Sequence, residues 1–397
     1  MRSLLLQVVA VTTINIKSIA QRLWLSMTTV LAIALVVMVL LAFLAMANGF
    51  QRTIGGSGAE DIAIVLRPGS QAEINSTVTR EQVRLIEDGP GIARGADGKP
   101  LVSPELYIVV DGINRSSGTK ANLPLRGIGE QGLVLRGGIA ISSGRMFNRG
   151  ANEVVVGKGL AREFEGLDVG STVAFGTTRW IVVGIFESAG SVFESEIWAD
   201  LPVVQSLFDR NNFFQTVRAR LTDASTLDAL KAYNDNDPRL KLDVKSEAAY
   251  FADQSSQTTD LIQKLGWPLA IAMAFGALAG ALNTMYSSVA ARAVEIATLR
   301  AIGFGGFSSF AGTLAESLAL AAIGGAIGAV ATYLIFDGIT ASTLGGNFTQ
   351  VVFAFRLSPG LVGEGVLLAL IVGGSSAACF RRCAPLACRL SRACLPD

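Results

Sequence analysis

The chain has 397 residues, half of them hydrophobic, and a formal net charge of +1. That apolar content is typical of a protein with several membrane spans, and the absence of a basic tract argues against a nucleic-acid partner. The sequence contains no histidine, which excludes Ser-His-Asp and Cys-His catalysis and histidine-ligated metal centres. We therefore predict no catalytic residue, no metal site and no cofactor in this chain.

The first part of the chain is an amphipathic segment followed by an apolar run. We predict that residues 1–23 form an amphipathic helix at the cytoplasmic interface of a membrane. Residues 24–47 are predicted to form the first span, because about 20 apolar residues match the thickness of a bilayer. The sequence Ala45-Met46-Ala47 also resembles a signal-peptidase site. We expect a retained helix, since the apolar part of a signal peptide has only about 7–15 residues.

Residues 48–265 alternate between short strand and helix patterns, as expected of an α+β domain. No cysteine occurs before residue 379, so this domain must be stabilised by its own core without disulfides. We predict a βαβ portion at each end of the domain and a β-rich insertion at about 112–213. The predicted strands are 61–66, 107–110, 153–156, 172–175, 180–186, 216–221 and 241–244, and the predicted helices are 79–88, 225–234 and 246–265.

Signals of enzymatic chemistry are weak in this domain. Glu194 and Glu196 are close enough in sequence to suggest paired carboxylates, but we interpret them as a surface pair beside Trp198. No G-x4-G-K-[ST] motif is present, so the chain has no phosphate-binding loop for ATP. A membrane-anchored enzyme is therefore the least favoured function.

Three more apolar runs crowd the C-terminal third, at 266–290, 306–336 and 359–378. The predicted fold class is a membrane protein with four transmembrane α-helices, arranged as one plus three. A large α+β extracytoplasmic domain is inserted between helices 1 and 2. Residues 337–358 are predicted to be an extracytoplasmic loop between the last two spans.

Positive charges at the ends of the spans predict the orientation. Arg2, Lys17 and Arg22 precede the first span, and the 379–397 tail holds four arginines. Lysine and arginine in short loops stay on the cytoplasmic side. We therefore predict that both termini and residues 291–305 are cytoplasmic, in a multi-pass protein of a bacterial inner membrane.

Small residues recur at four-residue spacing in two of the spans. Gly276 and Gly280 form one such pair, and Gly324 and Gly328 form another. This spacing allows close helix packing in lipid. Packing within one subunit and packing between two subunits are both open interpretations.

Two polar side chains within the predicted spans also stand out. Placing the side chain of Asn283 or Glu316 in lipid costs free energy, so the two residues are candidate functional positions. Glu316 could alternatively reach the cytoplasmic interface or pair with an arginine.

Residues 283–304 read NTMYSSVAARAVEIATLRAIGF and resemble the permease subunits of ABC transporters of the MacB/LolC/FtsX class. They resemble most the DevC-like permeases, which have no fused ATPase. The order and spacing of further motifs, including GRMF at 144–147 and EVVVG at 153–157, extend the resemblance to about residue 374. The positions that match the cytoplasmic motif of the family are Arg292, Glu295, Ile296, Leu299, Arg300, Ala301 and Gly303.

The resemblance implies partners and a mechanism. It implies that two permeases, identical or paralogous, each rest on a separate cytoplasmic ABC ATPase that holds Mg-ATP, with a periplasmic adaptor as a possible further partner. Residues 291–305 would be the coupling segment that docks on the ATPase. The implied function is export or extraction of a substrate. The alternative is an FtsX-like regulator of an extracytoplasmic enzyme such as a cell-wall hydrolase.

The C-terminal tail departs from the family pattern. Residues 375–397 are rich in cysteine and arginine, unlike the proline-containing basic segment that normally ends the fourth helix. A reading-frame error near codon 374 is one interpretation, and a genuine reduced tail is the other. The spacing of Cys379, Cys383, Cys388 and Cys394 is not that of a zinc site.

Overall fold

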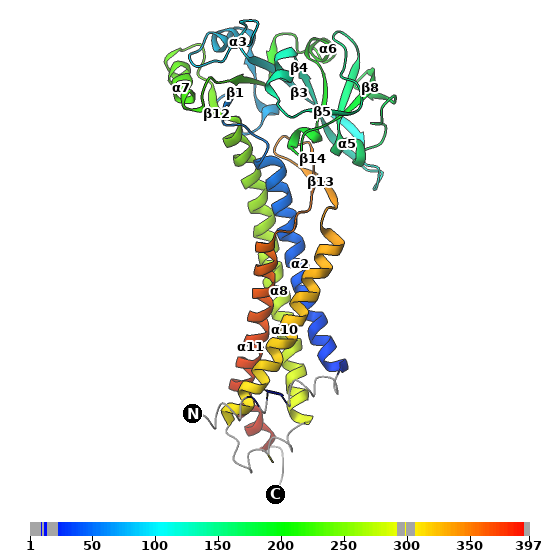
Figure 1. Cartoon of the computed structure of the whole chain (residues 1–397), viewed down its shortest axis with the longest axis vertical. Coiled ribbons are helices and arrows are strands. Elements are labelled where there is room, and N and C mark those ends of the chain that lie inside the picture. The colour runs from blue at the N-terminus through cyan, green and yellow to red at the C-terminus, as the bar shows by residue number, and fades with distance from the viewer. Residues whose placement is uncertain (1–8, 10–11, 14–22, 292–297, 299–305, 393–397) are drawn as a thin grey trace. The chain divides into compact units, whose positions relative to one another are not determined.

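The computed structural model describes residues 9, 12–13, 23–291, 298 and 306–392, and it divides into two units. The helical unit comprises residues 1–47, 262–339 and 355–397. The sheet unit comprises residues 48–261 and 340–354. Figure 1 shows the helices and strands of each unit. The predicted amphipathic helix 1–23 and the predicted coupling segment 291–305 lie almost wholly outside the described residues.

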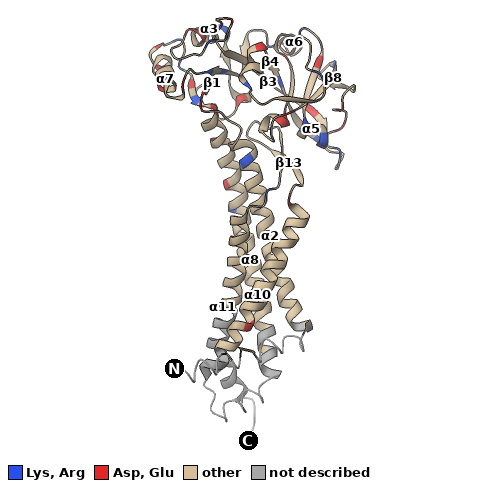
Figure 2. Cartoon of the chain, viewed as in Figure 1, with Lys and Arg blue, Asp and Glu red and all other residues tan. Residues whose placement is uncertain are grey.

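Four long helices contribute to the helical unit. They are α2 (Leu23–Gly55), α8 (Glu247–Ala291), α10 (Gly306–Phe336) and α11 (Pro359–Arg392). The ends of α2 and α8 that lie within 48–261 belong to the sheet unit. Figure 2 shows few charged residues along the helical unit, as expected of helices surrounded by lipid.

Three of these helices contain apolar stretches long enough to cross a membrane. They are Ser26–Gly55, Glu247–Asn283 and Ala311–Phe336. The described apolar part of α11, Pro359–Ser375, is shorter than a typical span. In α8 the charged residues Asp253, Asp260 and Lys264 occupy the first part of Glu247–Asn283, so the helix begins well before the part that would lie in lipid.

The first part of the sheet unit contains two split βαβ units. Strands β1, β3, β11 and β12 have the order β12-β1-β11-β3, and every adjacent pair is antiparallel. The connections through α3 and α7 each join two strands that are separated by one other strand. The predicted βαβ portion at each end is therefore confirmed, in its ferredoxin-like form. The bounds are β1 Ile62–Leu66, α3 Arg80–Glu87, β3 Val102–Ile113, β11 Thr216–Arg220, α7 Leu227–Asn236 and β12 Asp243–Ser246.

A second group of strands is inserted between β3 and β11. Strand β3 belongs to both groups, because residues 102–105 pair with β11 and residues 106–113 pair with β4. From β4 the sheet continues in the order β4-β9-β6-β8-β5, with β7 also paired to β8. The insertion holds β4 Lys120–Ile128, α4 Glu130–Leu135, β5 Ala140–Gly144, β6 Glu153–Gly157, α5 Lys158–Glu163, β7 Thr172–Phe175, β8 Thr178–Glu187, η3 Val192–Ser195, β9 Ile197–Asp200 and α6 Leu201–Leu207.

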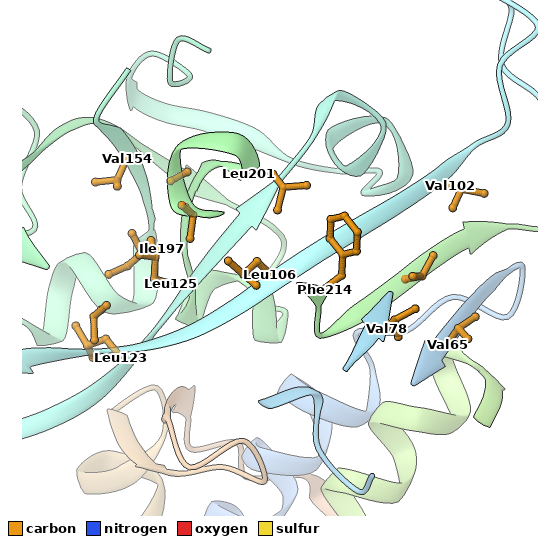
Figure 3. Close-up of a cluster of buried hydrophobic side chains, with 14 of the residues drawn as sticks. Val65, Val78, Val102, Leu106, Leu123, Leu125, Val154, Ile197, Leu201 and Phe214 are labelled. Atoms are coloured by element: carbon orange, nitrogen blue, oxygen red, sulfur yellow. The ribbon is translucent and has the colours of Figure 1, made fainter. Parts of the chain in front are cut away.

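One hydrophobic core runs through both parts of the sheet unit. Leu106 of β3 lies in the middle of it, with Val65 and Phe214 on one side and Leu125 and Ile197 on the other (Figure 3). Each of these side chains is nearly or fully buried. Every residue of β1 and of β9 is buried, so these two strands are covered on both faces.

Short elements complete the sheet unit. Helix α3 begins with a capping box, in which the Thr79 hydroxyl accepts from the Gln82 N–H and the Gln82 side chain accepts from the Thr79 N–H. Ser76, three residues before Thr79, accepts a hydrogen bond from the Arg67 N–H. The remaining elements are η2 Glu73–Asn75, β2 Val78–Thr79, β10 Phe213–Phe214 and η4 Ala224–Thr226.

The segment predicted as a loop at 337–358 contains a β-hairpin. Strands β13 (Thr340–Leu344) and β14 (Gln350–Ala354) pair antiparallel, and both belong to the sheet unit. The sequence VVFAF at 351–355 has β-branched and aromatic residues typical of a strand. The strand pattern was present in the sequence, but it lies between two long apolar runs, and the segment that joins them was predicted only as a loop.

Candidate coupling site

The structure locates the predicted helix-packing glycines on two kinds of surface. A Cβ at Gly324 would lie 2.9 Å from the Val30 carbonyl oxygen of α2, and a Cβ at Gly328 would lie 2.5 Å from that of Ala34. These two glycines therefore pack inside the subunit. A Cβ at Gly276 or Gly280 would meet no atom within 4 Å, so that face of α8 has room for a neighbour.

The two polar residues predicted to lie within spans are also described. Asn283 is exposed near the end of α8, and Glu316 is partly buried in the first half of α10. Glu316 precedes Gly324 by eight residues on α10, and Asn283 follows Gly280 by three residues on α8. All the coupling positions from Arg292 to Gly303 lie outside the described residues.

The sheet unit is connected to the apolar helices at four points in the chain. The connections follow Ala47 in α2, precede Ile262 in α8, precede Thr340 of β13 and follow Ala354 of β14. The segments of the sheet unit next to these points gather around one part of the sheet. We call this region, formed by 48–58, 247–261, the 340–354 hairpin and the buried charges beneath them, the junction.

The hairpin is attached to the sheet by specific polar contacts. The Ser195 hydroxyl donates to the Val352 carbonyl oxygen at 3.3 Å and accepts from the Val352 N–H at 2.9 Å. The Tyr107 and Thr349 hydroxyls are hydrogen-bonded at 2.8 Å. All of these groups are buried. A buried serine that satisfies both backbone groups of one strand residue fixes the register of the hairpin on the sheet.

The ends of α2 and α8 pack tightly on each other. A Cβ at Gly58 would lie 2.4 Å from Ala248, and a Cβ at Gly55 would lie 2.9 Å from the Ser255 hydroxyl. Phe50 contacts Phe353 of the hairpin edge-to-face, with 5.5 Å between ring centroids. At Gly58 any side chain would meet the backbone of α8, whereas at Gly55 it would meet the Ser255 side chain.

Beneath these segments lies a network of buried charges. Arg126 of β4 donates to Glu73 at 2.6 Å, to Glu105 at 2.9 Å and to Glu196 at 2.7 and 2.8 Å. Arg136 makes a bidentate pair with Glu105, with both distances 2.6 Å. A pair of this kind has the strongest hydrogen-bond geometry available to a carboxylate.

The third guanidinium of the network links it to α8. Arg218 of β11 lies 3.4 Å from Glu73, 3.7 Å from Glu105 and 3.2 Å from Glu247, the first residue of α8. The network thus joins strands from both parts of the sheet to the helix that continues into the apolar region.

The electrostatics of the network keep most of its groups charged. Burial alone would raise the pKa of the Glu105 carboxyl, but Arg136, Arg218 and Arg126 together lower it below its usual range. Burial also acts against ionisation of Glu196, yet its pKa is lowered, chiefly by Arg126. Arg126 itself has a raised pKa because its carboxylate partners outweigh its burial. These groups are therefore fixed ions over the physiological range.

The structure corrects the interpretation of Glu194 and Glu196 as a surface carboxylate pair. Its side chain is 6% exposed, and it accepts from Arg126 and from the Trp198 indole N–H at 2.7 Å. Glu194 accepts instead from the backbone N–H groups of Ser188 and Gly190, both at 2.8 Å. The two carboxylates have separate partners and do not form a catalytic pair.

A signal for the network was present in the sequence. Arg126 stands in the strand LPLRGI and Arg218 in TVRAR, each among residues expected to be buried. Lysine and arginine are almost never fully buried unless they are paired. Charged residues at covered strand positions therefore indicate buried partners, although the sequence does not identify which carboxylates they are.

A small cavity separates the network from the hairpin. Its volume is about 20 Å³, enough for roughly one water molecule. Glu73, Tyr107 and Glu196 line it on one side, and Asn347 and Thr349 of the hairpin line it on the other. The Asn347 side-chain oxygen is buried without a protein hydrogen-bond partner, which makes it the natural partner of such a water.

A match to a family model identifies the type of domain. The family model of the MacB-like periplasmic core domain matches residues 26–234, just over half of the chain. No curated protein matches the sequence.

Two solved domains are among the similar structures. The extracellular domain of the noncanonic ABC-type transporter YknZ from Gram-positive bacteria is 17% identical, with a TM-score of 0.34, over 47% of this chain and 99% of that one. The periplasmic region of MacB from Actinobacillus actinomycetemcomitans is 13% identical, with a TM-score of 0.36, over 50% of this chain and 92% of that one.

Proposed function

We propose that this chain, which belongs to the family with a MacB-like periplasmic core domain, is the permease subunit of an ATP-driven ABC transporter. The observation that carries the proposal is the junction. All four chain connections between the apolar helices and the sheet unit lead into segments that are packed or bonded there. Movement of the helices would therefore reach the sheet through the junction.

In this proposal the chain relays motion and does not hydrolyse ATP. It has no phosphate-binding loop, so Mg-ATP would sit wholly in a separate cytoplasmic ATPase. Residues 291–305 would dock on that ATPase as a coupling segment, with Arg292, Glu295 and Arg300 facing the partner. Ile296, Leu299 and Gly303 would form the remainder of the docking surface.

The transporter would contain two permeases and two ATPases. ATPase dimers of this type present two equivalent docking surfaces, and a single permease would leave one of them empty. Gly276 and Gly280 offer an open face on α8 for contact with the second permease. The described part of α11 would complete a fourth span together with the residues that follow it.

The proposal is tested with the purified chain and the ATPase encoded next to it. We expect no ATP turnover by the chain alone and stimulated turnover in the complex. Glu295→Lys or Arg300→Glu should abolish both stimulation and co-purification of the ATPase. Arg149→Glu, an exposed charge reversal in the sheet unit, is the matched control and should leave both unchanged.

Three results would count against parts of this proposal. Turnover by the lone chain would refute the separation of permease and ATPase. Wild-type association of both coupling variants would refute the assignment of residues 291–305. Stimulation of a cell-wall hydrolase without movement of any substrate would favour the FtsX-like regulator instead.

The proposed orientation is tested by cysteine labelling. In a variant without the four native cysteines, Ser142→Cys should react with a membrane-impermeant thiol reagent from outside the inner membrane. Ser142 is exposed on β5, so its reactivity reports the location of the sheet unit. A cysteine at Thr298, on the predicted cytoplasmic segment, should react only after the membrane is permeabilised. Labelling of the Ser142 position only from the cytoplasm would reverse the proposed topology.

A further inference from the structure

The charges of the junction network do not balance. Within the described residues, Glu73, Glu105, Glu196 and Glu247 face Arg126, Arg136 and Arg218, and none of the seven side chains is more than 6% exposed. Four carboxylates and three guanidinium groups leave one excess negative charge if every group is ionised. An uncompensated charge at such a depth is strongly unfavourable, and a buried group commonly binds a proton to remove it.

Glu247 is the carboxylate held least well as an anion. Glu73, Glu105 and Glu196 each accept a charge-assisted hydrogen bond from Arg126. Glu247 has the Arg218 guanidinium at 3.2 Å, but the nearest nitrogen of that group makes no hydrogen bond.

The surroundings of Glu247 come from several elements. Arg218 reaches it from β11, and the Ala59 N–H donates to it at 3.3 Å. Arg136, which follows α4, and Glu105 of β3 act on it at longer range. Glu247 belongs to the sheet unit, in the polar part of α8 that precedes the apolar stretch.

We propose that Glu247 is a proton-controlled contact between α8 and the sheet. With Glu247 neutral, three carboxylates balance three guanidinium groups, and the first turn of α8 is held against the sheet. With Glu247 ionised, the excess charge loosens this turn and draws water toward it. The attachment of α8 to the sheet therefore depends on the pH of the compartment around the sheet unit.

The direction of the pH effect follows from linkage. Burial raises the pKa of the Glu247 carboxyl, against the opposing effects of Arg218 and Arg136. A carboxyl whose pKa is higher in the folded protein contributes stability that is complete below the unfolded pKa, about 4.3. That contribution is lost as the pH rises through the folded pKa. Glu105 and Glu196 act in the opposite sense, since their lowered pKa values weaken the fold only in acid.

Hydrogen exchange of the full chain in nanodiscs tests the proposal. The amides of residues 251–255 of α8 are compared between wild type and Glu247→Gln at each pH, because intrinsic exchange rates then cancel. We expect wild-type protection to fall relative to the variant as the pH rises from about 5 to about 8. The fall should be about tenfold for each pH unit between about 5 and the pKa of Glu247 in the folded protein.

A matched control removes a charge nearby without touching the network. Asp253→Asn lies on the same helix, and the Asp253 side chain is 63% exposed with only a 3.6 Å contact to Lys245. Its pH profile should follow that of wild type.

A second measurement covers the case in which Glu247→Gln fails to fold. Wild-type protein should then show the infrared absorption of a buried protonated carboxylic acid at about pH 5 that disappears toward about pH 8. Parallel exchange profiles for wild type and Glu247→Gln would overturn the proposal. Absence of the carboxylic acid absorption in wild type would overturn it as well.

Discussion

Replacing Arg126 by methionine should lower the unfolding midpoint of the sheet unit by roughly 6–20 °C. Arg126 donates hydrogen bonds to Glu73, Glu105 and Glu196, and its guanidinium lies 4.8 Å from the centre of the Tyr107 ring. Methionine fills a similar volume but leaves these buried carboxylates with one fewer guanidinium. Removing one partner from a buried ionic network costs about 3–5 kcal/mol, because the remaining charges lose their compensation.

The measurement follows tryptophan fluorescence of the full chain in detergent during heating. Trp180 and Trp198 are both fully buried in the sheet unit, and Trp198 contacts the network directly. Arg149→Met is the matched control, because the Arg149 side chain is 61% exposed and its pair with Glu130 lies at the surface. That control should cost at most about 1 kcal/mol. Equal midpoints for the two variants would show that the network does not stabilise the domain.

Substituting alanine at Gly328 should destabilise the packing of α10 on α2 by about 1–3 kcal/mol. The added Cβ would lie 2.5 Å from the Ala34 carbonyl oxygen and 3.0 Å from the Val37 Cβ, both on α2. Backbone at that distance cannot move aside as a flexible side chain can. The helices must therefore separate, and the apolar contacts around Val37 and Ala329 weaken.

Gly276→Ala is the corresponding control on α8. The new Cβ would meet nothing within 4 Å, and alanine is favoured over glycine in a helix by about 1 kcal/mol. Both variants are compared by resistance to proteolysis in detergent and by recovery from membranes. Gly328→Ala should be cleaved faster than wild type and Gly276→Ala should not. Equal resistance of the two variants would contradict packing of Gly328 inside the subunit.

Gly276 also bears on how two permeases would pair. If Gly276 contacts the second permease, as proposed, then Gly276→Leu should reduce pairing while the fold of each chain stays intact. The sequence alone allowed Gly324 and Gly328 to pack either within one subunit or between two subunits. The structure shows that they pack within one subunit, against α2. The GxxxG spacing is the same in α8 and α10, so spacing alone could not distinguish them.

Local patterns in the sequence determined the elements themselves. Apolar runs of bilayer length predict α2, α8 and α10 whatever the tertiary structure, because backbone N–H and C=O groups in lipid must form hydrogen bonds within each helix. Alternation followed by a turn predicted β1, and short β-branched runs bounded by glycine predicted β6 and β8, again from local sequence alone. The cytoplasmic motif from Arg292 to Gly303 remains a sequence prediction, since it lies outside the described residues.

Only the tertiary structure decided which residues meet at the junction. Glu73, Arg126 and Glu247 are far apart in the chain and come together through strand pairing that joins distant segments. A hydrogen bond between Ser195 and Val352 likewise connects residues 157 positions apart. Periodicity reports which face a residue lies on, but it does not report which other segment covers that face. The partner of a buried charge is therefore set by register and topology, and the sequence alone did not identify which segments meet at the junction.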